Sequence, residues 1–389
     1  MAFPLGEAIS LEQLSTDPHP HLARLRAHEP VTWVPVLDGW LVTRRDLCVQ
    51  VMRDADTFTV DDPRFSTAQV VGQSMLSLDG SEHRRHREPF AGALLYADVR
   101  ERFSERVDRE ARRLAGNLAS IGKAEIRRDL AGPLAVAVVS AALDLVGVEV
   151  RTVLSWYENI VADVDRLSRG EPATGAGLEA VAQLGHHVRL SSESRSGVLA
   201  GARNELTADE VVSNAAVMMF GGIETSEGMT TSLFWHLLTN PEQLQMVRDN
   251  RTLGRQAVEE SLRLEPAAAR VDRYSTKDVD LAGARIRKGD LVIVSLTAAN
   301  RDPEAFSDPN RFDVLRPNAR AHLAFAQGPH ACIGIHLAKM ETLAALGAVL
   351  DLWPAVRLEQ ISGGPTGLVF RKPHSLPVCW DPSTDSGRP

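Results

Sequence analysis

Apolar residues along the chain recur mainly at spacings of three and four, which is the period of an amphipathic helix. This pattern dominates from about residue 80 to about residue 265 and predicts a large helical block. A shorter helix is expected at 18–28. Two β-prone runs on either side of Asp38-Gly39 predict a hairpin within about residues 30–45, since an Asp-Gly pair favours a tight turn.

Short runs rich in β-branched residues return after the helical block, at 279–281, 284–286 and 291–296. A further strand pair is expected from 368–370 and 376–380, and the polar residues 381–389 are expected to form a frayed tail. The sequence shows no internal repeat and no low-complexity linker. We therefore expect residues 1–389 to form a single domain of mostly α structure with small β-sheets.

One helical pattern is long enough to cross the whole molecule. Thr207 and Glu210 form a capping box, and Asn240-Pro241 marks the end, which leaves about 32 residues without proline. At 1.5 Å per residue this helix spans roughly 48 Å. Its middle reads Gly221-Gly222-Ile223-Glu224-Thr225, where each interior glycine costs about 1 kcal/mol relative to alanine. The glycines are expected to open a functional notch; the alternative is a packing notch with an ordinary threonine bond to the backbone.

Composition and charge narrow the classes of function. The chain has 44% hydrophobic and 24% charged residues, as ordinary globular proteins do. Its 43 basic and 51 acidic residues give a net charge of −8, which argues against nucleic acid as a partner. We find neither a signal peptide nor the ~18 uninterrupted apolar residues of a membrane span. Three widely spaced cysteines suggest no disulfide framework and indicate a reducing cytoplasm.

The most informative cysteine is Cys332, in the segment Phe325-Ala-Gln-Gly-Pro-His-Ala-Cys-Ile-Gly334. It precedes a helical run expected at about 333–350, and a helix N-terminus lowers the pKa of a thiol. Gly328 and Gly334 permit close approach of the backbone to a flat ligand, and the phenylalanine offers a ring to cover the sulfur. A thiolate in such a loop suits an axial ligand of haem iron, although an isolated cysteine is otherwise often buried and inert.

The pattern F-x-x-G-x-H-x-C-x-G resembles the haem-binding signature of the cytochrome P450 family. Only the common glycine directly after the phenylalanine is replaced, by Ala326. The resemblance implies the cytochrome P450 fold, with a long central helix over haem b and the cysteine loop, about 325–334, beneath it. It implies that Cys332 is the axial ligand of the haem iron. Because no N-terminal anchor is evident, the chain resembles the soluble bacterial members.

A second motif of the family lies in the long helix. Its glycine-rich segment resembles the A/G-G-x-D/E-T motif, which implies that Gly221 and Gly222 make room for O₂ beside the haem. Thr225 and Glu224 are then expected to relay protons during oxygen activation.

A third motif indicates a structural network. Glu260-Ser-Leu-Arg263 and the downstream Phe312-Asp-Val-Leu-Arg316 resemble the family's E-x-x-R helix and its third arginine. The resemblance implies that Glu260, Arg263 and Arg316 form a buried, non-catalytic set of ion pairs. Removing one member would leave an unpaired buried charge, at a cost of about 3–5 kcal/mol.

A haem carries two propionates that need cations nearby. Positions in the family imply four candidates: His83, Arg87, Arg273 and His330. Two alternatives remain open at this point. The basic run that contains His83 could simply be exposed, and Arg270 could take the place of Arg273, although a ten-residue spacing from Arg263 favours Arg273.

Substrate-pocket candidates come from variable segments of the family. By position they are Met218, Ala268, Val271, Thr366 and Leu368. Arg270 could meet an acidic group of a substrate, and a surface or propionate role is the alternative. None of these residues names a substrate.

The resemblance implies a haem-thiolate monooxygenase that inserts one oxygen atom from O₂ into a small, largely apolar molecule, by hydroxylation or epoxidation. Electrons are expected from NAD(P)H through an external ferredoxin reductase and ferredoxin, since no flavin or iron–sulfur sequence is fused here. A cytoplasmic monomer is expected, acting in secondary metabolism or xenobiotic oxidation. Its ferredoxin would dock on the cysteine side, near Arg84 or Arg112.

Three alternatives compete with this interpretation. A peroxide-driven or coupling-type enzyme is one, but the family's peroxide users tend to lose the acid–alcohol pair that Glu224 and Thr225 provide. A non-catalytic haem sensor needs Cys332 but has no use for that pair. A helical scaffold without a cofactor would require every motif to be a coincidence.

Overall fold

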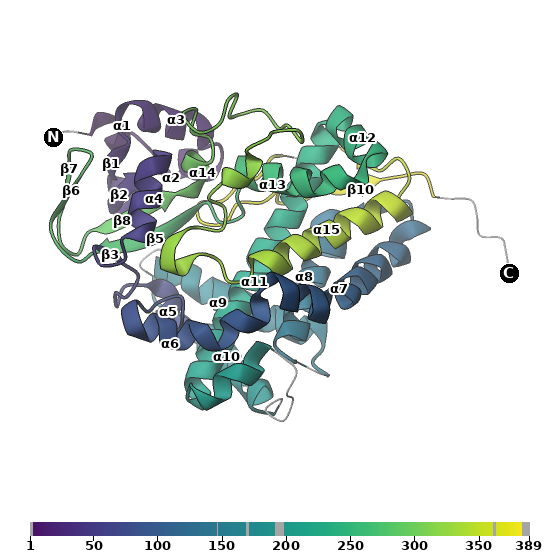
Figure 1. The fold of residues 1–389 in the computed structure, drawn as a ribbon, viewed down its shortest axis with the longest axis horizontal. Coiled ribbons are helices and arrows are strands. Elements are labelled where there is room, and N and C mark those ends of the chain that lie inside the picture. Colours follow the sequence, from purple (N-terminus) through teal and green to yellow (C-terminus); the bar gives the residue numbers. More distant parts are fainter. Residues whose placement is uncertain (1–2, 146, 169–170, 191–197, 361–362, 383–389) are drawn as a thin grey trace.

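The computed structural model describes residues 3–145, 147–168, 171–190, 198–360 and 363–382. Most of the predicted tail therefore lies outside the described residues. The helices are α1 Pro4–Glu7, α2 Leu11–Ser15, α3 His19–His28, α4 Arg45–Arg53, α5 Ser66–Val71, α6 Gly80–Ala91, α7 Tyr96–Ala119, α8 Gly132–Ala142, α9 Val150–Ser168, α10 Ala176–Leu190, α11 Ala208–Thr239, α12 Pro241–Asp249, α13 Gly254–Leu264, α14 Leu296–Ala299 and α15 Ile335–Leu352. Figure 1 shows strands β1, β2, β3, β5 and β8 at one end of the molecule, while most of the helices and strand β10 lie toward the other.

The strands form three small sheets. They are β1 Val31–Val34, β2 Gly39–Val42, β3 Phe58–Thr59, β4 Lys123–Glu125, β5 Arg270–Ser275, β6 Val279–Leu281, β7 Ala284–Ile286, β8 Leu291–Ser295, β9 Arg357–Leu358 and β10 Pro377–Cys379. The largest sheet has the order β1-β2-β8-β5-β3, in which β2 and β8 are parallel and the other pairs are antiparallel. The predicted hairpin is present, and Asp38 adopts the left-handed conformation at its turn, with φ +46°.

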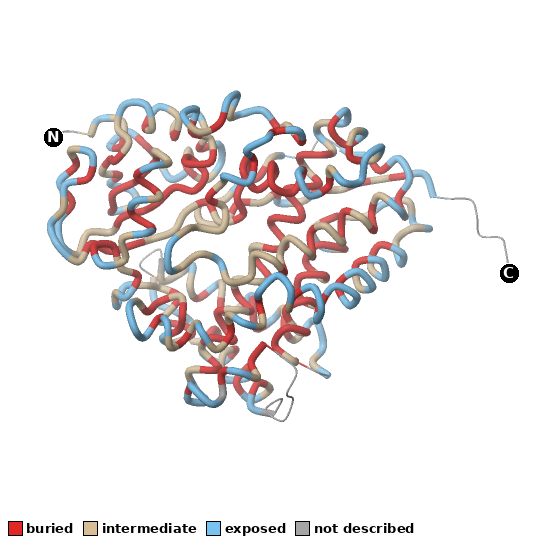
Figure 2. Tube along the Cα trace, viewed as in Figure 1, coloured by how far each residue is buried: buried red, intermediate tan, exposed pale blue. Residues whose placement is uncertain are grey.

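Helix α11 is the axis of the helical part and runs behind α8, α13 and α15 in Figure 1. Thr207 and Glu210 make the predicted capping box, and the helix ends one residue before Asn240. Its side chains are buried around most of its circumference, so the helix is held by packing on every side. Figure 2 shows the buried segments concentrated in the interior and the exposed ones along the rim.

Helix α15 carries the cysteine loop at its start and packs along α7 (Figure 1). Its far end is fixed by Trp353, which donates a hydrogen bond to the Ala115 carbonyl at 2.9 Å and stacks on Trp380 at 4.1 Å. The helix starts at Ile335, two residues later than predicted, because the backbone turns at Gly334 before the helix begins. Among the described residues, no helix is long and apolar enough to cross a membrane.

The predicted strand pair near the C-terminus is wrong in part. Residues 377–379 form β10, but this strand pairs with β4 and β9, not with 368–370. Residues 368–370 instead lie in a turned segment in which Phe370 bridges to Ala268. Gly367 has φ +123°, and a Cβ there would lie 1.9 Å from the Phe370 carbonyl, so the turn requires glycine. This segment becomes important below.

Candidate functional site

The cysteine loop is closed by its own backbone. The Cys332 amide donates to the Phe325 carbonyl at 2.9 Å, and the Ala326 amide donates to the Leu323 carbonyl at 2.8 Å. Gly328 has φ +76°, and a Cβ there would lie 2.3 Å from the Met52 carbonyl of α4. Close packing against α4 therefore restricts this position to glycine.

Ala326 stands where the family commonly has glycine, and its backbone shows why glycine is preferred. Its φ is +56°, in the left-handed region that a Cβ makes unfavourable. Since Ala326 keeps the conformation, the surrounding loop must impose it.

The pKa of the Cys332 thiol is shifted upward, whereas the helix N-terminus led us to expect a downward shift. Burial among protein atoms raises the pKa of this thiol, and this effect exceeds the lowering by the Gly334 and Ile335 amides and by the Arg87 charge. The amides at the start of α15 act in the predicted direction, but they are not the largest influence. The residue is nevertheless exposed to solvent in the structure. A bound metal ion would deprotonate the thiol, because coordination stabilises the thiolate.

Cationic side chains gather beside the loop. Arg87 of α6 donates to the Ala331 carbonyl at 2.6 Å, and His330 pairs with Asp79 at 2.7 Å. The His83 ring lies 4.3 Å from the His330 ring. His83 is buried, so the alternative of an exposed basic run does not apply to it.

The five-stranded sheet contributes Arg273. It is buried at 4% exposure and lies close enough to Asp79 for the charges to interact. Arg270 occupies the opposite face of β5, since alternate residues of a strand point to opposite faces, and its Nε lies 3.5 Å from Asp272. Arg273, not Arg270, therefore belongs to the cluster beside the loop.

These residues fit a haem. The buried His83 Nε2 has no hydrogen-bond partner among the described residues. Burial, followed by the charges of His330 and Arg87, lowers the pKa of His83 to about 4. Burial opposes ionisation of Asp79, but hydrogen bonds from His330 and Thr59 outweigh it and lower the Asp79 pKa to about 2. Two arginines thus face one carboxylate, and this excess of positive charge favours a further anionic group, such as a haem propionate.

The notch in α11 is made by one glycine, not two. A Cβ at Gly221 would meet nothing within 4 Å, whereas a Cβ at Gly222 would lie 2.6 Å from Val139 of α8. Gly222 therefore allows α8 to approach, which corrects the prediction that both glycines make room for a ligand. Thr225 donates to the Gly221 carbonyl at 2.5 Å, beside the open position.

Glu224, the expected partner of Thr225 in a proton relay, is engaged in an ion pair. Its carboxylate pairs with Lys372 at 2.8 Å, and the same Lys372 Nζ lies 2.8 Å from Glu227. Glu227 in turn accepts from Arg127 Nε at 2.5 Å. We call Arg127, Glu227, Lys372 and Glu224 the α11 ion cluster.

The Glu260 network is a buried set of ion pairs. Arg263 donates to Glu260 at 2.7 and 2.9 Å, and Arg316 donates at 2.9 and 3.1 Å. The Glu260 and Arg263 side chains have 0% exposure and that of Arg316 has 5%. Further guanidinium N–H groups donate to backbone carbonyls, those of Asn300, Ser307, Asp308, Pro309 and Arg311.

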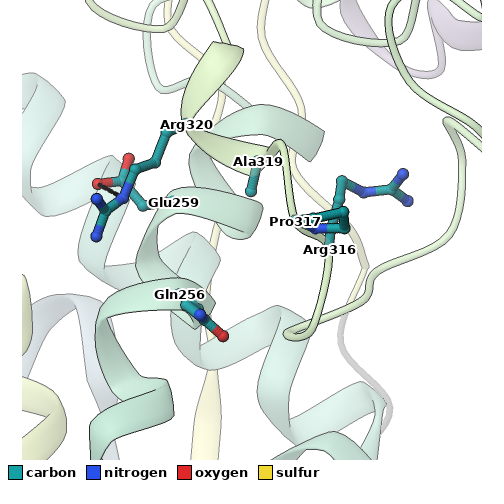
Figure 3. A pocket seen from close by; sticks show the side chains of 6 residues that line it. All are labelled: Gln256, Glu259, Arg316, Pro317, Ala319 and Arg320. Atoms are coloured by element: carbon teal, nitrogen blue, oxygen red, sulfur yellow. Dashed lines mark ion pairs between the residues drawn. The ribbon is translucent and has the colours of Figure 1, made fainter.

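A polar pocket of about 240 Å³ lies on the outer side of this network (Figure 3). Its walls are Gln256, Glu259, Arg316, Pro317, Ala319 and Arg320. Figure 3 shows Glu259 and Arg320 directed at one another, while Arg316 points away from them. None of the predicted substrate residues lines this pocket, so it is distinct from the predicted substrate site.

The predicted substrate residues lie in two surroundings. Met218 of α11 is half-buried against the helical core, and Ala268 and Val271 are half-buried beside the five-stranded sheet. Thr366 is exposed, and Leu368 packs against the apolar cluster of the N-terminal helices. From the same segment, Phe370 contacts Phe220 of α11 edge-on, with ring centroids 5.6 Å apart.

Sequence reasoning missed four residues of this region: Asp79, Phe370, Lys372 and Glu341. Glu341 of α15 has 2% exposure, and burial, opposed only by a hydrogen bond with Ser226, raises its pKa to about 8. The sequence does set Asp79 and Lys372 apart. Asp79 directly precedes α6, and Lys372 is one of only five lysines in the chain. Their partners, however, lie far away in the sequence.

Comparisons with known proteins agree with the geometry. The sequence pattern of the family described as Cytochrome P450 matches residues 190–353. The chain is 31% identical to nocardicin C N-oxygenase of Nocardia uniformis subsp. tsuyamanensis, across 97% of this chain and 98% of that protein. It is also 31% identical to the cytochrome P450 monooxygenase PikC of Streptomyces venezuelae, across 97% and 94%.

Solved structures agree as well. P450BioI, in complex with acyl carrier protein bearing hexadec-9Z-enoic acid, superimposes with a TM-score of 0.86 at 27% identity. That match covers 95% of this chain and 100% of the other. CalO2 gives a TM-score of 0.86 at 28% identity, across 94% and 96%. The chain therefore belongs to the cytochrome P450 family of haem-thiolate monooxygenases.

Proposed function

We propose that this protein inserts one oxygen atom from O₂ into a small, largely apolar molecule, using electrons from NAD(P)H that arrive through ferredoxin reductase and ferredoxin. The observation that carries the proposal is the open position at Gly221, with the Thr225 hydroxyl bonded beside it. A haem sensor or a scaffold has no need for a side-chain-free position next to a hydroxyl in the middle of a packed helix.

Cys332 would hold the iron, and the cations beside the loop would hold the propionates. The two arginines, Arg87 and Arg273, exceed the one carboxylate of Asp79, so the cluster favours a further anionic group. When bound, haem would supply the site for oxygen activation, with the thiolate donating electron density. Phe325, Gly328 and Gly334 would shape the loop, and the Glu260 network would hold the chain around it.

On the other side, Thr225 would donate a proton and Glu224 would replenish it. Thr225 Oγ1 is held by the Gly221 carbonyl, which leaves an oxygen lone pair free to accept a proton in turn. Glu224 has only 8% exposure. Its hydrogen bonds therefore lie in a region of low dielectric, where they are stronger than in water.

The pocket wall is apolar on every side that we assign to it. Met218 and Phe220 come from α11, Val271 comes from β5, and Phe370 comes from the turned segment. We infer that Phe370 takes the place that the sequence suggested for Leu368. This lining suits an apolar substrate; carrier-bound delivery, as in the P450BioI complex, would suit it equally.

An apolar patch beside the cysteine loop is our candidate docking surface for ferredoxin. Leu95 and Tyr96 are 58% and 54% exposed, and the Tyr96 ring lies 5.5 Å from His336, four residues after Cys332. Arg112 is already paired with acidic residues, so we favour the exposed Arg84 for steering. Arg84→Glu should slow reduction by ferredoxin severalfold at low salt, whereas Arg285→Glu in β7 should not; equal rates would remove this assignment.

An optical titration of the haem-loaded protein against a compound library tests the function. A thiolate-type Soret band that shifts for one compound class, followed by product formation with ferredoxin and NAD(P)H, supports a monooxygenase. Product formation with hydrogen peroxide alone would favour the peroxide-driven alternative. Folded protein that takes up no haem would show that the assignment of Cys332 is wrong.

A further inference from the structure

Lys372 is held in an unusual place for a lysine. Its side chain is 14% exposed, and its ammonium lies 2.8 Å from both Glu224 and Glu227, one helical turn apart on α11. One cation thus binds two carboxylates, each with 8% exposure. Such an arrangement is stable only while all its members stay charged and paired, because an unpaired buried charge is costly.

The α11 ion cluster also reaches the surface. Glu227 is bound by Arg127, whose side chain is 33% exposed and also donates to the His374 carbonyl at 3.1 Å. Alternating charges therefore run inward from Arg127 through Glu227 and Lys372 to Glu224. Every link is a side-chain contact, so each can exchange its partner without unfolding the backbone.

The segment that carries Lys372 also carries the wall of the proposed pocket. The Lys372 amide donates to the Thr366 carbonyl at 3.2 Å, and the Thr366 amide donates back at 3.1 Å, which closes the turned segment 366–372. Between these ends, Phe370 contacts Phe220. Arg371 fixes the base by its bond to Glu265 at 2.6 Å. One short segment thus touches both the proposed substrate wall and the acid of α11.

We propose that Lys372 is a positioning residue for Glu224, which it holds away from Thr225 in an ion pair, so that segment 366–372 sets when the acid can serve the hydroxyl. The inference rests on the function proposed above. Glu224 and Thr225 are adjacent in sequence, yet their side chains make separate bonds, to Lys372 and to the Gly221 carbonyl. Proton delivery then requires Glu224 to leave Lys372.

The charges around Glu224 show that Lys372 is the cation that binds it directly. Lys372 faces it from the C-terminal segment, Arg127 from the π-helical segment Arg127–Ala131, and Glu227 from α11 itself. Glu125 adds a further negative charge near Arg127. Without Lys372, Glu224 would keep the repulsion of Glu227 and lose the ammonium that holds its carboxylate in position.

The first test compares Lys372→Met and Lys372→Arg with wild type, using Lys277→Met at an exposed position as the control. Product formed per electron consumed is measured for each protein. We expect Lys372→Met to lower this ratio severalfold, because Glu224 would no longer be held in position. Lys372→Arg should restore the wild-type ratio, and Lys277→Met should not differ from wild type. The optical Kd of a bound compound should change less than twofold in Lys372→Met.

A second test does not depend on turnover. Lys372→Met and Glu224→Gln are combined, and thermal unfolding midpoints are compared. If the pair exists, the double variant loses less than the two single variants added together, whereas the exposed pair Arg109 and Glu105 gives additive losses. Additive losses at Lys372 and Glu224 would overturn the inference.

The two proposals fail in different ways. A wild-type protein that makes no product under any electron supply would overturn the proposed function. A wild-type protein that turns over, with Lys372→Met forming the same amount of product per electron consumed, would overturn the role of Lys372 alone. Equal impairment in Lys372→Met and Lys372→Arg would also overturn it, because it would mean that shape and not charge matters there.

Discussion

Two buried clusters of glutamate and cations lie in this protein, and they are built in opposite ways. Glu260 is bound by Arg263 and Arg316, and both guanidinium groups are completed by backbone carbonyls. Glu224 is bound by Lys372, which it shares with Glu227, and within the described part of the chain the Lys372 amine bonds to these carboxylates and not to a backbone carbonyl.

The difference separates a scaffold from a site that can change. Backbone carbonyls cannot rotate away, so the Glu260 network has one arrangement and 0–5% exposure. Side-chain contacts can exchange, and the α11 ion cluster leads out to a partly exposed arginine. Ion pairs between glutamate and cations are therefore rigid where backbone carbonyls also bind the cations, and they can rearrange where only side chains bind them.

The largest effect is expected at the rigid cluster. Glu260→Ala leaves two buried guanidinium groups without their carboxylate, at a cost of about 3–5 kcal/mol in the free energy of unfolding. We expect little haem-loaded protein, measured by absorbance after purification, and a lower urea midpoint. Glu105→Ala breaks an exposed pair on α7 and should change stability by less than about 1 kcal/mol. Normal haem incorporation by Glu260→Ala would contradict the scaffold role.

Glu341 extends the comparison to a buried carboxyl with no cation partner within the described ranges. Its Oε1 has no hydrogen-bond partner there, and burial raises its pKa to about 8 from 4.5. The folded state therefore holds this proton more tightly than the unfolded state. The contribution of Glu341 to the free energy of unfolding should be fully present below pH 4.5. It should fall as pH rises to about 8, by about 1.4 kcal/mol per pH unit at most.

Glu341→Gln removes this titration while keeping the shape of the side chain. Urea unfolding at pH 5, 6.5 and 8 should show the variant losing less stability than wild type as pH rises. The difference should be concentrated between pH 5 and 8. Curves that stay parallel over this range would mean that Glu341 has an ordinary pKa.

Much of the fold could be predicted because its signals are local. The capping box at Thr207 and the stop at Asn240-Pro241 gave both ends of α11 within a residue, and the Asp-Gly turn gave the hairpin of β1 and β2. The strand pair predicted from 368–370 failed for the opposite reason. The other predicted member, 377–379 in β10, pairs with β4 and β9, and these partners are chosen by tertiary packing, which no local pattern records.

The site divides in the same way. Cys332, Arg273 and the Glu260 network could be named because their spacing in sequence carries the information. The partner of Glu224 could not, since Lys372 reaches it from the C-terminal segment, far away in the sequence. Gly222 was misjudged because a glycine that admits a ligand and one that admits Val139 look alike in sequence.

A substitution at Thr225 tests the region beside the α11 ion cluster, where side-chain contacts can rearrange. Thr225→Ala should leave stability nearly unaltered and reduce product formed per electron consumed by about 10- to 100-fold, as expected when a positioned proton donor is lost. Thr239→Ala is the matched control, because Thr239 makes the same bond to a carbonyl one turn back, at 2.7 Å, at the exposed end of α11. Unchanged coupling in Thr225→Ala would count against the relay.

The smallest effect is expected in the cysteine loop, where a rigid framework imposes strain. Ala326 is held at φ +56°, which costs alanine about 1–2 kcal/mol, and glycine would remove this cost while adding entropy to the unfolded chain. We expect Ala326→Gly to raise the free energy of unfolding by about 0.5–1 kcal/mol and to leave the Soret band in place. Ala331 lies in the same loop at φ −53°, where alanine is unstrained. Ala331→Gly should therefore lower the free energy of unfolding. If both variants lose stability alike, Ala326 is not strained in solution, and the rigidity that we assign to the cysteine side is confined to the Glu260 network.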